Sequence, residues 1–156
     1  MTNSTSKPGP ITPWTIRWTK DHLFESGPEG RSHLIDADSV AAPGPVETLL
    51  GALLACSGVD VVDILAKRRT PARSFSASAK AHRRADDPRR VMRLELQYIV
   101  AGDGIDPDAA ERAIELALEK YCTVAASLGA DIVTTSQLVL NGSEHPPRSR
   151  KMWSPG

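Results

Sequence analysis

The sequence predicts an α+β fold in which mostly antiparallel sheets pack around one long central helix. Apolar and polar residues alternate at 14–19, 75–81 and 91–100, with the two-residue period of half-buried strands. Residues 49–55 are instead apolar on nearly all sides of a helix. The segments follow one another in the order ββ(β)–α–ββ–α(α)–β. Strands that mostly follow strands favour an antiparallel sheet covered by helices.

Length and charge narrow the class of protein. A chain of 156 residues is about one domain long and can bury a core without disulfide bonds. Nineteen basic residues balance nineteen acidic ones, so no overall field favours nucleic acid or an anionic membrane. The most apolar stretch, 49–65, contains Asp60 and Asp63 and is not expected to span a membrane. Residues 1–13 do not form a signal peptide, so we expect a cytoplasmic protein with reduced thiols.

The first expected elements are a strand and a hairpin. Trp14, Ile16 and Trp18 alternate with polar residues, which indicates a strand with one apolar face. Residues 24–36 predict a hairpin around the glycine- and proline-containing turn at 27–30.

A long helix is expected from Pro45 to about Arg69. Proline suits the first helical turn, and Thr70-Pro71 supplies a stop. A helix that is apolar all round needs cover on every side, and a small sheet supplies only one. We therefore expect a second copy of the chain to provide the missing cover in a homodimer. The alternative is that the two later helices cover it.

The second half of the chain predicts two strands, two helical segments and a last strand. Residues 75–81 and 91–100 form strands joined by the polar hairpin segment 83–90. Asp106 is suited to cap a helix that starts at Pro107. The buried stripe expected on this helix consists of Ala110, Ile114, Ala117, Leu118 and Tyr121. A second helical segment at 124–128 precedes the final strand, 132–140.

Both ends of the chain are expected to be flexible tails, at 1–13 and 141–156, around a single domain at 14–140. The N-terminal segment is rich in serine, threonine and proline. The C-terminal segment contains Pro146-Pro147 and a group of basic residues, Arg148, Arg150 and Lys151. Neither segment contains enough apolar surface to order itself.

Two cysteines, Cys56 and Cys122, are the candidates for chemistry. Cys56 lies midway along the long helix, and Cys122 lies where one helical segment gives way to the next. Free N–H groups at that junction would favour a thiolate, whereas burial would raise the pKa of both thiols. Both residues are alternatively inert core cysteines. The four histidines show no metal-ligand spacing, and no cofactor motif is present, so we expect no cofactor.

Two segments make a more specific assignment possible. Residues 45–65, PVETLLGALLACSGVDVVDIL, resemble the first cysteine motif of the OsmC/Ohr family, and 119–125, EKYCTVA, resemble the second. The similarity extends over about residues 18–140. It implies an intertwined homodimer with active sites at the subunit interface, and a thiol peroxidase activity on organic hydroperoxides. By motif, Cys56 would become a sulfenic acid that Cys122 resolves, and a dithiol reductant, possibly lipoyl-type, would complete the cycle.

The sequence departs from the family pattern at one position. The better-known peroxidases carry a glutamate ten residues before the first cysteine, where this chain has Val46. Glu47 stands nine residues before Cys56, about 100° further round the helix, where it either supports catalysis or stabilises the helix end. The spacing resembles a less characterised branch of the family. The alternative function is therefore a non-catalytic small-molecule-binding or stress protein with inert core cysteines.

Overall fold

The computed structural model describes residues 8–152. Its internal contacts divide the chain into two compact units, one up to residue 48 and one from residue 49 onward. The single domain predicted for residues 14–140 therefore contains parts of both units. Residues 8–13 are exposed and form neither helix nor strand, and the rest of the predicted N-terminal tail lies outside the described residues.

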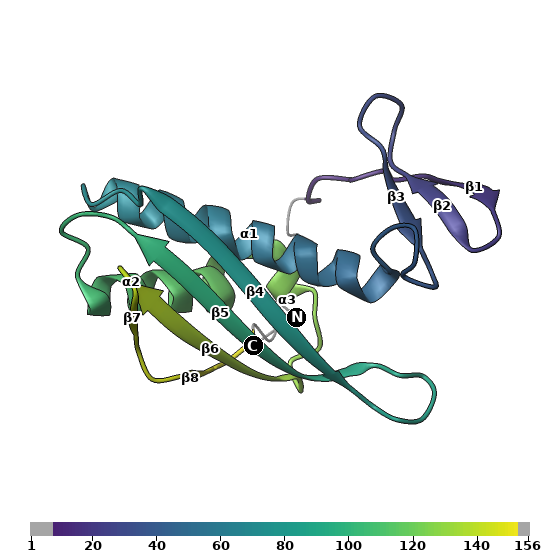
Figure 1. The fold of residues 1–156 in the computed structure, drawn as a ribbon. Helices are drawn as coiled ribbons and strands as arrows, with labels where there is room; N and C mark the ends of the chain where they lie inside the picture. The colour runs from purple at the N-terminus through teal and green to yellow at the C-terminus, as the bar shows by residue number, and fades with distance from the viewer. Residues whose placement is uncertain (1–7, 153–156) are drawn as a thin grey trace, which may run out of the picture. The chain divides into compact units, whose positions relative to one another are not determined.

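The first unit is a three-stranded antiparallel sheet. Its strands are β1 (Ile16–Lys20), β2 (Leu23–Ser26) and β3 (His33–Asp36), in the order β1-β2-β3 (Figure 1). The register aligns Trp18 with Phe24 and Phe24 with Ile35, so apolar side chains share one face. Gly27 adopts φ 118° in the turn after β2, a conformation that favours glycine. The predicted strand and hairpin are both present.

The loop between β3 and the long helix is held by the side chain of Asp36. The Asp36 carboxylate accepts hydrogen bonds from the backbone N–H groups of Ala41, Asp38 and Val40. The bond from Ala41 contributes most to lowering the pKa of Asp36. These three hydrogen bonds thus hold the backbone of a loop that is neither helix nor strand.

Helix α1 runs from Pro45 to Lys67. Its end is a Schellman motif, in which Arg69 adopts φ 64° and its N–H donates to Ala66. The N–H of Thr70 donates to the Leu65 carbonyl and completes the motif. Among the described residues, α1 is the helix that is long and apolar enough, by length and composition, to cross a membrane.

One face of α1 belongs to the core of the second unit. Leu53, Ser57, Val61 and Leu65 follow one another at four-residue spacing, and each is 0% exposed. Val59, on another face, is 56% exposed. The alternative that the later helices of the same chain complete the cover of α1 is therefore wrong, and cover by a second copy of the chain stays a prediction.

The second unit contains a five-stranded sheet. Its strands are β4 (Ser74–Arg83), β5 (Val91–Ala101), β6 (Val133–Leu140), β7 (Ser143–Glu144) and β8 (Arg148–Arg150). Antiparallel pairs join β4 to β5 and join β6 to both β7 and β8, whereas β5 and β6 are parallel. The parallel pair requires a crossover, which α2 (Pro107–Leu116), the π-helical turn η1 (Ala117–Tyr121) and α3 (Thr123–Ala126) provide. The predicted α+β class is confirmed.

The core lies between the inward faces of these elements. Leu94, Leu96, Tyr98 and Val100 of β5 are buried with the inner face of α2 (Figure 1). The Asp106 side chain accepts from the Ala109 N–H at 3.0 Å and caps α2 as predicted. The prediction that Tyr121 belongs to the buried stripe of this helix is wrong, because Tyr121 is 49% exposed.

The C-terminal segment corrects a second prediction. Residues 141–152 are not a free tail, because β7 and β8 pair with β6. Arg150 and Met152 are buried, and Arg150 pairs with the buried carboxylate of Glu111. The carboxylate that Arg150 pairs with lies far away in the chain, and such a partner leaves no local pattern in the sequence. Residues 153–156 lie outside the described part of the chain.

Candidate two-cysteine site

Cys56 projects from the middle of α1 at the border of the core. Its side chain is partly buried and packs against the core of the second unit. The next residue, Ser57, fixes this turn of the helix. Its Oγ donates to the Leu53 carbonyl at 2.9 Å and lies 2.8 Å from the Tyr98 hydroxyl on β5. The helix is thereby tied to the sheet one residue from the Cys56 thiol.

Cys122 occupies the junction between η1 and α3. Its N–H donates to the Ala117 carbonyl at 2.8 Å, five residues back, as in a π-helix. Its own backbone is extended, with φ −67° and ψ 108°, so the helix stops there. The Sγ atom then accepts from the Ala125 N–H at 3.3 Å, which places the cysteine as the N-cap of α3. The side chain is 1% exposed.

The two thiols interact within the second unit. Burial is the main cause that raises the pKa of Cys122 to about 12. Hydrogen bonding and charge at Cys56 raise the pKa of Cys122 further, while the N–H groups of Ala125 and Val124 lower it. Both thiols are free in this structure. The fold thus brings together the two cysteines that the sequence analysis singled out.

Tyr98 is a polar neighbour of this pair that sequence reasoning missed. Burial raises the pKa of Tyr98 to about 12, and negative charge at Cys122 acts in the same direction. The bond to Ser57 and the charge of Arg150 oppose that shift. The alternation of β5 correctly placed Tyr98 on the inner face, but periodicity alone gives no sign of which hydroxyl partner it meets.

Glu47, the third predicted site residue, has a helix-capping contact. Its Oε2 accepts from the Gly44 N–H at 2.6 Å, and Gly44 precedes the first residue of α1. This geometry corresponds to the glutamate half of a capping box. The supporting role in catalysis stays a prediction for Glu47.

Within residues 8–152, no three histidine, cysteine, aspartate or glutamate side chains gather as a metal-ion site would require. What the site contains is two thiols in one core, Cys56 partly buried and Cys122 buried, together with a Ser57–Tyr98 hydroxyl pair. Paired thiols can alternate between dithiol and disulfide forms. Fold and site together define an α+β protein with a two-cysteine centre.

The chain belongs to the OsmC-like protein family, whose model matches residues 36–137. This confirms the resemblance seen in the two cysteine motifs. Protein YhfA of Escherichia coli strain K12 is 36% identical over 116 residues, which cover 72% of this chain and 86% of YhfA.

Solved structures share the fold. A hypothetical protein from Aquifex aeolicus VF5 has a TM-score of 0.78 at 23% identity, covering 94% of this chain and 100% of that one. The organic hydroperoxide resistance protein OhrB of Bacillus subtilis has a TM-score of 0.54 at 14% identity. That match covers 83% of this chain and 96% of OhrB. At these identities the similarity establishes the fold alone.

Proposed function

We propose that this protein is a cysteine-dependent thiol peroxidase that reduces organic hydroperoxides, with Cys56 as nucleophile and Cys122 as resolving residue. The observation that carries the proposal is that Cys56 of α1 packs against the core cluster that contains Cys122, close enough to affect the pKa of the Cys122 thiol. Membership of the OsmC-like family supports it. A protein of the same fold is a hydroperoxide resistance protein, which is consistent with this substrate class.

The reaction has two steps before reduction. The Cys56 thiolate attacks the terminal peroxide oxygen, the O–O bond breaks, and the alcohol leaves after taking a proton, so that Cys56 becomes a sulfenic acid. The Cys122 sulfur then attacks the Cys56 sulfur and the S–O bond breaks. Hydroxide leaves with the Cys122 proton as water, and a disulfide forms. A dithiol, such as a lipoyl group, returns both thiols by disulfide exchange.

Burial supports this division of roles. Cys56 lies at the border of the core, where a hydroperoxide can approach, whereas Cys122 is 1% exposed. Because the pKa of Cys122 is raised to about 12, its thiol keeps its proton at neutral pH. The thiolate is the reactive form of cysteine, so Cys56 rather than Cys122 is assigned as the nucleophile toward the hydroperoxide.

The proposal includes a homodimer in the cytoplasm. Apolar side chains of α1 outside the core face are exposed, including Val59 at 56% and Leu49 at 38%. In the first unit, the β1 residues Ile16 and Trp18 are 61% and 68% exposed. Apolar surfaces of this kind mark association sites. A second copy of the chain is the partner that the family resemblance implies.

A non-catalytic ligand-binding role is the second candidate. The buried Cys122 thiol, with its raised pKa, favours it, as does Val46 at the position of the expected acid. In that case both cysteines would be inert parts of the core, and the protein would bind a small apolar molecule without consuming it.

One titration separates the two candidates. Reduced protein is mixed with an organic hydroperoxide such as tert-butyl hydroperoxide, free thiols are counted over time, and the linkage is mapped by peptide mass spectrometry. The peroxidase proposal expects rapid loss of two thiols per chain with a Cys56–Cys122 disulfide. Thiols that react no faster than free cysteine in the folded protein would overturn it and leave the binding role.

A further inference from the structure

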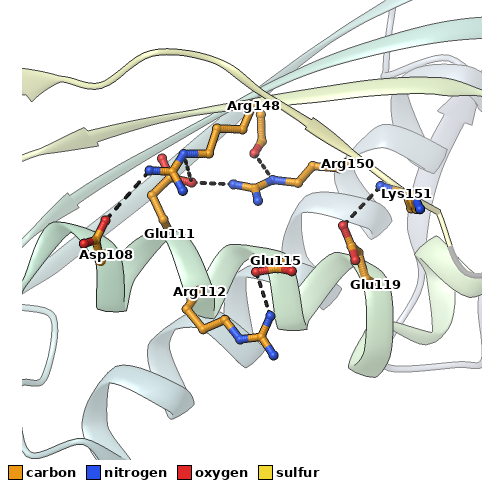
Figure 2. A network of polar contacts seen from close by, with 9 residues as sticks. Asp108, Glu111, Arg112, Glu115, Glu119, Arg148, Arg150 and Lys151 are labelled. Atoms are coloured by element: carbon orange, nitrogen blue, oxygen red, sulfur yellow. Dashed lines mark hydrogen bonds and ion pairs between the residues drawn. The ribbon is translucent and has the colours of Figure 1, made fainter.

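The C-terminal residues 148–152, here called the C-terminal clamp, attach to three different elements around Cys122. The Arg150 side chain donates Nε–H to Ser136 on β6 at 2.7 Å. It also donates an Nη2–H to the Glu111 carboxylate on α2. Arg150 and Glu111 are 5% and 2% exposed, so this is a buried ion pair (Figure 2). Arg150 and Met152 therefore anchor the clamp in the core, while Arg148, Ser149 and Lys151 are exposed.

The clamp also reaches the turn that precedes Cys122. The Lys151 N–H donates to Oε1 of Glu119 at 3.2 Å, and Glu119 belongs to η1, three residues before Cys122 (Figure 2). Met152, the next residue, is 5% exposed and lies in the same core cluster as Cys122. One contact from the clamp thus falls on the short segment that precedes the Cys122 thiol, and Met152 anchors the clamp in the core to which Cys122 also belongs.

The segment with Cys122 needs support from outside. Residues 117–121 form a π-helical turn, which is rare and is frequently found at functional sites. The backbone becomes extended at Cys122 immediately afterwards. Local hydrogen bonding alone does not favour this path over a continuous α-helix, so contacts from elsewhere in the fold must select it.

The charges at the clamp oppose its release. Arg148 lies 3.6 Å from the Glu111 carboxylate, which therefore faces two arginines from one strand. The other Glu111 oxygen, Oε1, is buried and has no hydrogen-bond partner among the described residues. Moving the strand away would leave this carboxylate buried and unpaired, which is strongly unfavourable.

We propose that the C-terminal clamp positions Cys122 against Cys56 and so sets the effective concentration of the resolving thiol, with Glu119 and Arg150 as positioning residues. The inference rests on the proposed two-cysteine function. A Cys56 sulfenic acid has two fates. Condensation with the Cys122 thiol gives a disulfide and water, whereas a second hydroperoxide oxidises it to sulfinic acid and releases an alcohol. A Cys122 held in place favours the first fate.

The first test uses no hydroperoxide, so it is independent of peroxidase activity. The protein is equilibrated with reduced and oxidised glutathione, and the fraction with a Cys56–Cys122 disulfide gives the effective concentration of the pair. Glu119→Ala should lower it about tenfold, equivalent to about 30 mV. Glu119→Gln, which keeps the acceptor oxygen, should stay within about twofold of the wild type.

Glu115→Ala is the matched control. Glu115 lies one turn earlier on α2 and pairs with Arg112 at 2.8 Å, away from the clamp (Figure 2). It should leave the effective concentration unchanged. The proposal is overturned if Glu119→Ala matches the wild type, if Glu115→Ala lowers the value equally, or if the wild type forms no Cys56–Cys122 disulfide in glutathione.

A second variant removes the buried ion pair without leaving a lone charge. The double change Glu111→Leu with Arg150→Met replaces both partners by apolar side chains, which buried sites tolerate. If it folds with the wild-type circular dichroism, the effective concentration should fall at least as much as in Glu119→Ala. An unchanged effective concentration would overturn the proposal that the clamp positions Cys122.

Kinetics separate the clamp from the proposed function. With hydroperoxide, Glu119→Ala should form the Cys56 sulfenic acid at the wild-type rate, measured by trapping with dimedone. The disulfide should then form more slowly, and sulfinic acid should accumulate. A further outcome is that the wild type fails to react with hydroperoxide while Glu119→Ala still lowers the effective concentration measured in glutathione. That result would overturn the peroxidase proposal and support the positioning role of the clamp.

Discussion

The Tyr98 hydroxyl lies 2.8 Å from Ser57 Oγ, and both residues are 0% exposed. Because Ser57 donates its hydrogen to the Leu53 carbonyl, Tyr98 is the donor of this pair. The bond joins α1 to β5 one residue from Cys56. Both residues are buried, and Ser57 keeps its own bond to the Leu53 carbonyl, so it is the Tyr98 hydroxyl that depends on this contact for its hydrogen bond.

The two partners should respond differently to removal. Tyr98→Phe leaves Ser57 bonded to Leu53 and should cost about 1 kcal/mol of unfolding free energy. Ser57→Ala leaves the Tyr98 hydroxyl buried without an acceptor and should cost more, about 1–3 kcal/mol. Urea unfolding measures both. Tyr121→Phe, at a position 49% exposed, is the control and should change stability by less than about 0.5 kcal/mol. Equal losses in Tyr98→Phe and Tyr121→Phe would contradict the assigned contact.

The elements that the sequence predicted well are those with a local signature. The alternation in β5, the Asp106 cap and the Pro45 start of α1 each depend on a few neighbouring residues, and the structure contains them. Both cysteines were found because they stand in motifs. The pairing of Arg150 with Glu111 joins residues far apart in the chain and has no such signature. For the same reason, the sequence predicts a flexible tail where the structure has β8, and it gives no sign of the hydrogen bond between Tyr98 and Ser57.

The pKa of Cys122 predicts how stability depends on pH. Burial raises that pKa to about 12, above the value of about 8.5 for an unfolded cysteine. The unfolded thiol therefore ionises first, so the contribution of Cys122 is complete below about pH 8.5 and is lost as the pH rises toward 12. Burial also raises the pKa of Tyr98, so its contribution to the unfolding free energy is likewise lost above about pH 10.

Reduced protein should thus lose unfolding free energy between pH 7.5 and 9.5, and Cys122→Ala should lose less over the same interval. Chemical denaturation under reducing conditions at the two pH values checks this. The readout is the difference between pH values, so the cavity left by the alanine does not enter it. If both proteins show the same decrease, the folded Cys122 thiol ionises as an unfolded one does.

Two glycines of α1 provide a matched test of its packing. A Cβ at Gly58 would come within 2.8 Å of the Phe75 ring on β4, whereas a Cβ at Gly51 would meet nothing within 4 Å. Gly51→Ala should stabilise the chain by up to about 1 kcal/mol through helix propensity. Gly58→Ala gains the same propensity but must displace the ring, an overpacking that costs about 1–3 kcal/mol. Thermal unfolding should therefore move the two variants in opposite directions, and a stabilised Gly58→Ala would show that α1 does not approach β4 this closely.

Glu47 allows the capping and the catalytic interpretations to be separated. Its Oε2 accepts from the Gly44 N–H, a contact that glutamine can keep through its amide oxygen and alanine cannot. If capping is its whole role, Glu47→Ala lowers the unfolding free energy by about 1 kcal/mol, and Glu47→Gln retains both stability and hydroperoxide turnover. If the carboxylate charge supports the Cys56 thiolate, Glu47→Gln instead stays stable and loses turnover. We expect the first result, because the hydrogen bond to Gly44 already occupies this carboxylate at the helix end. Stability from urea unfolding and turnover with tert-butyl hydroperoxide, measured on the same two variants, decide between the two roles.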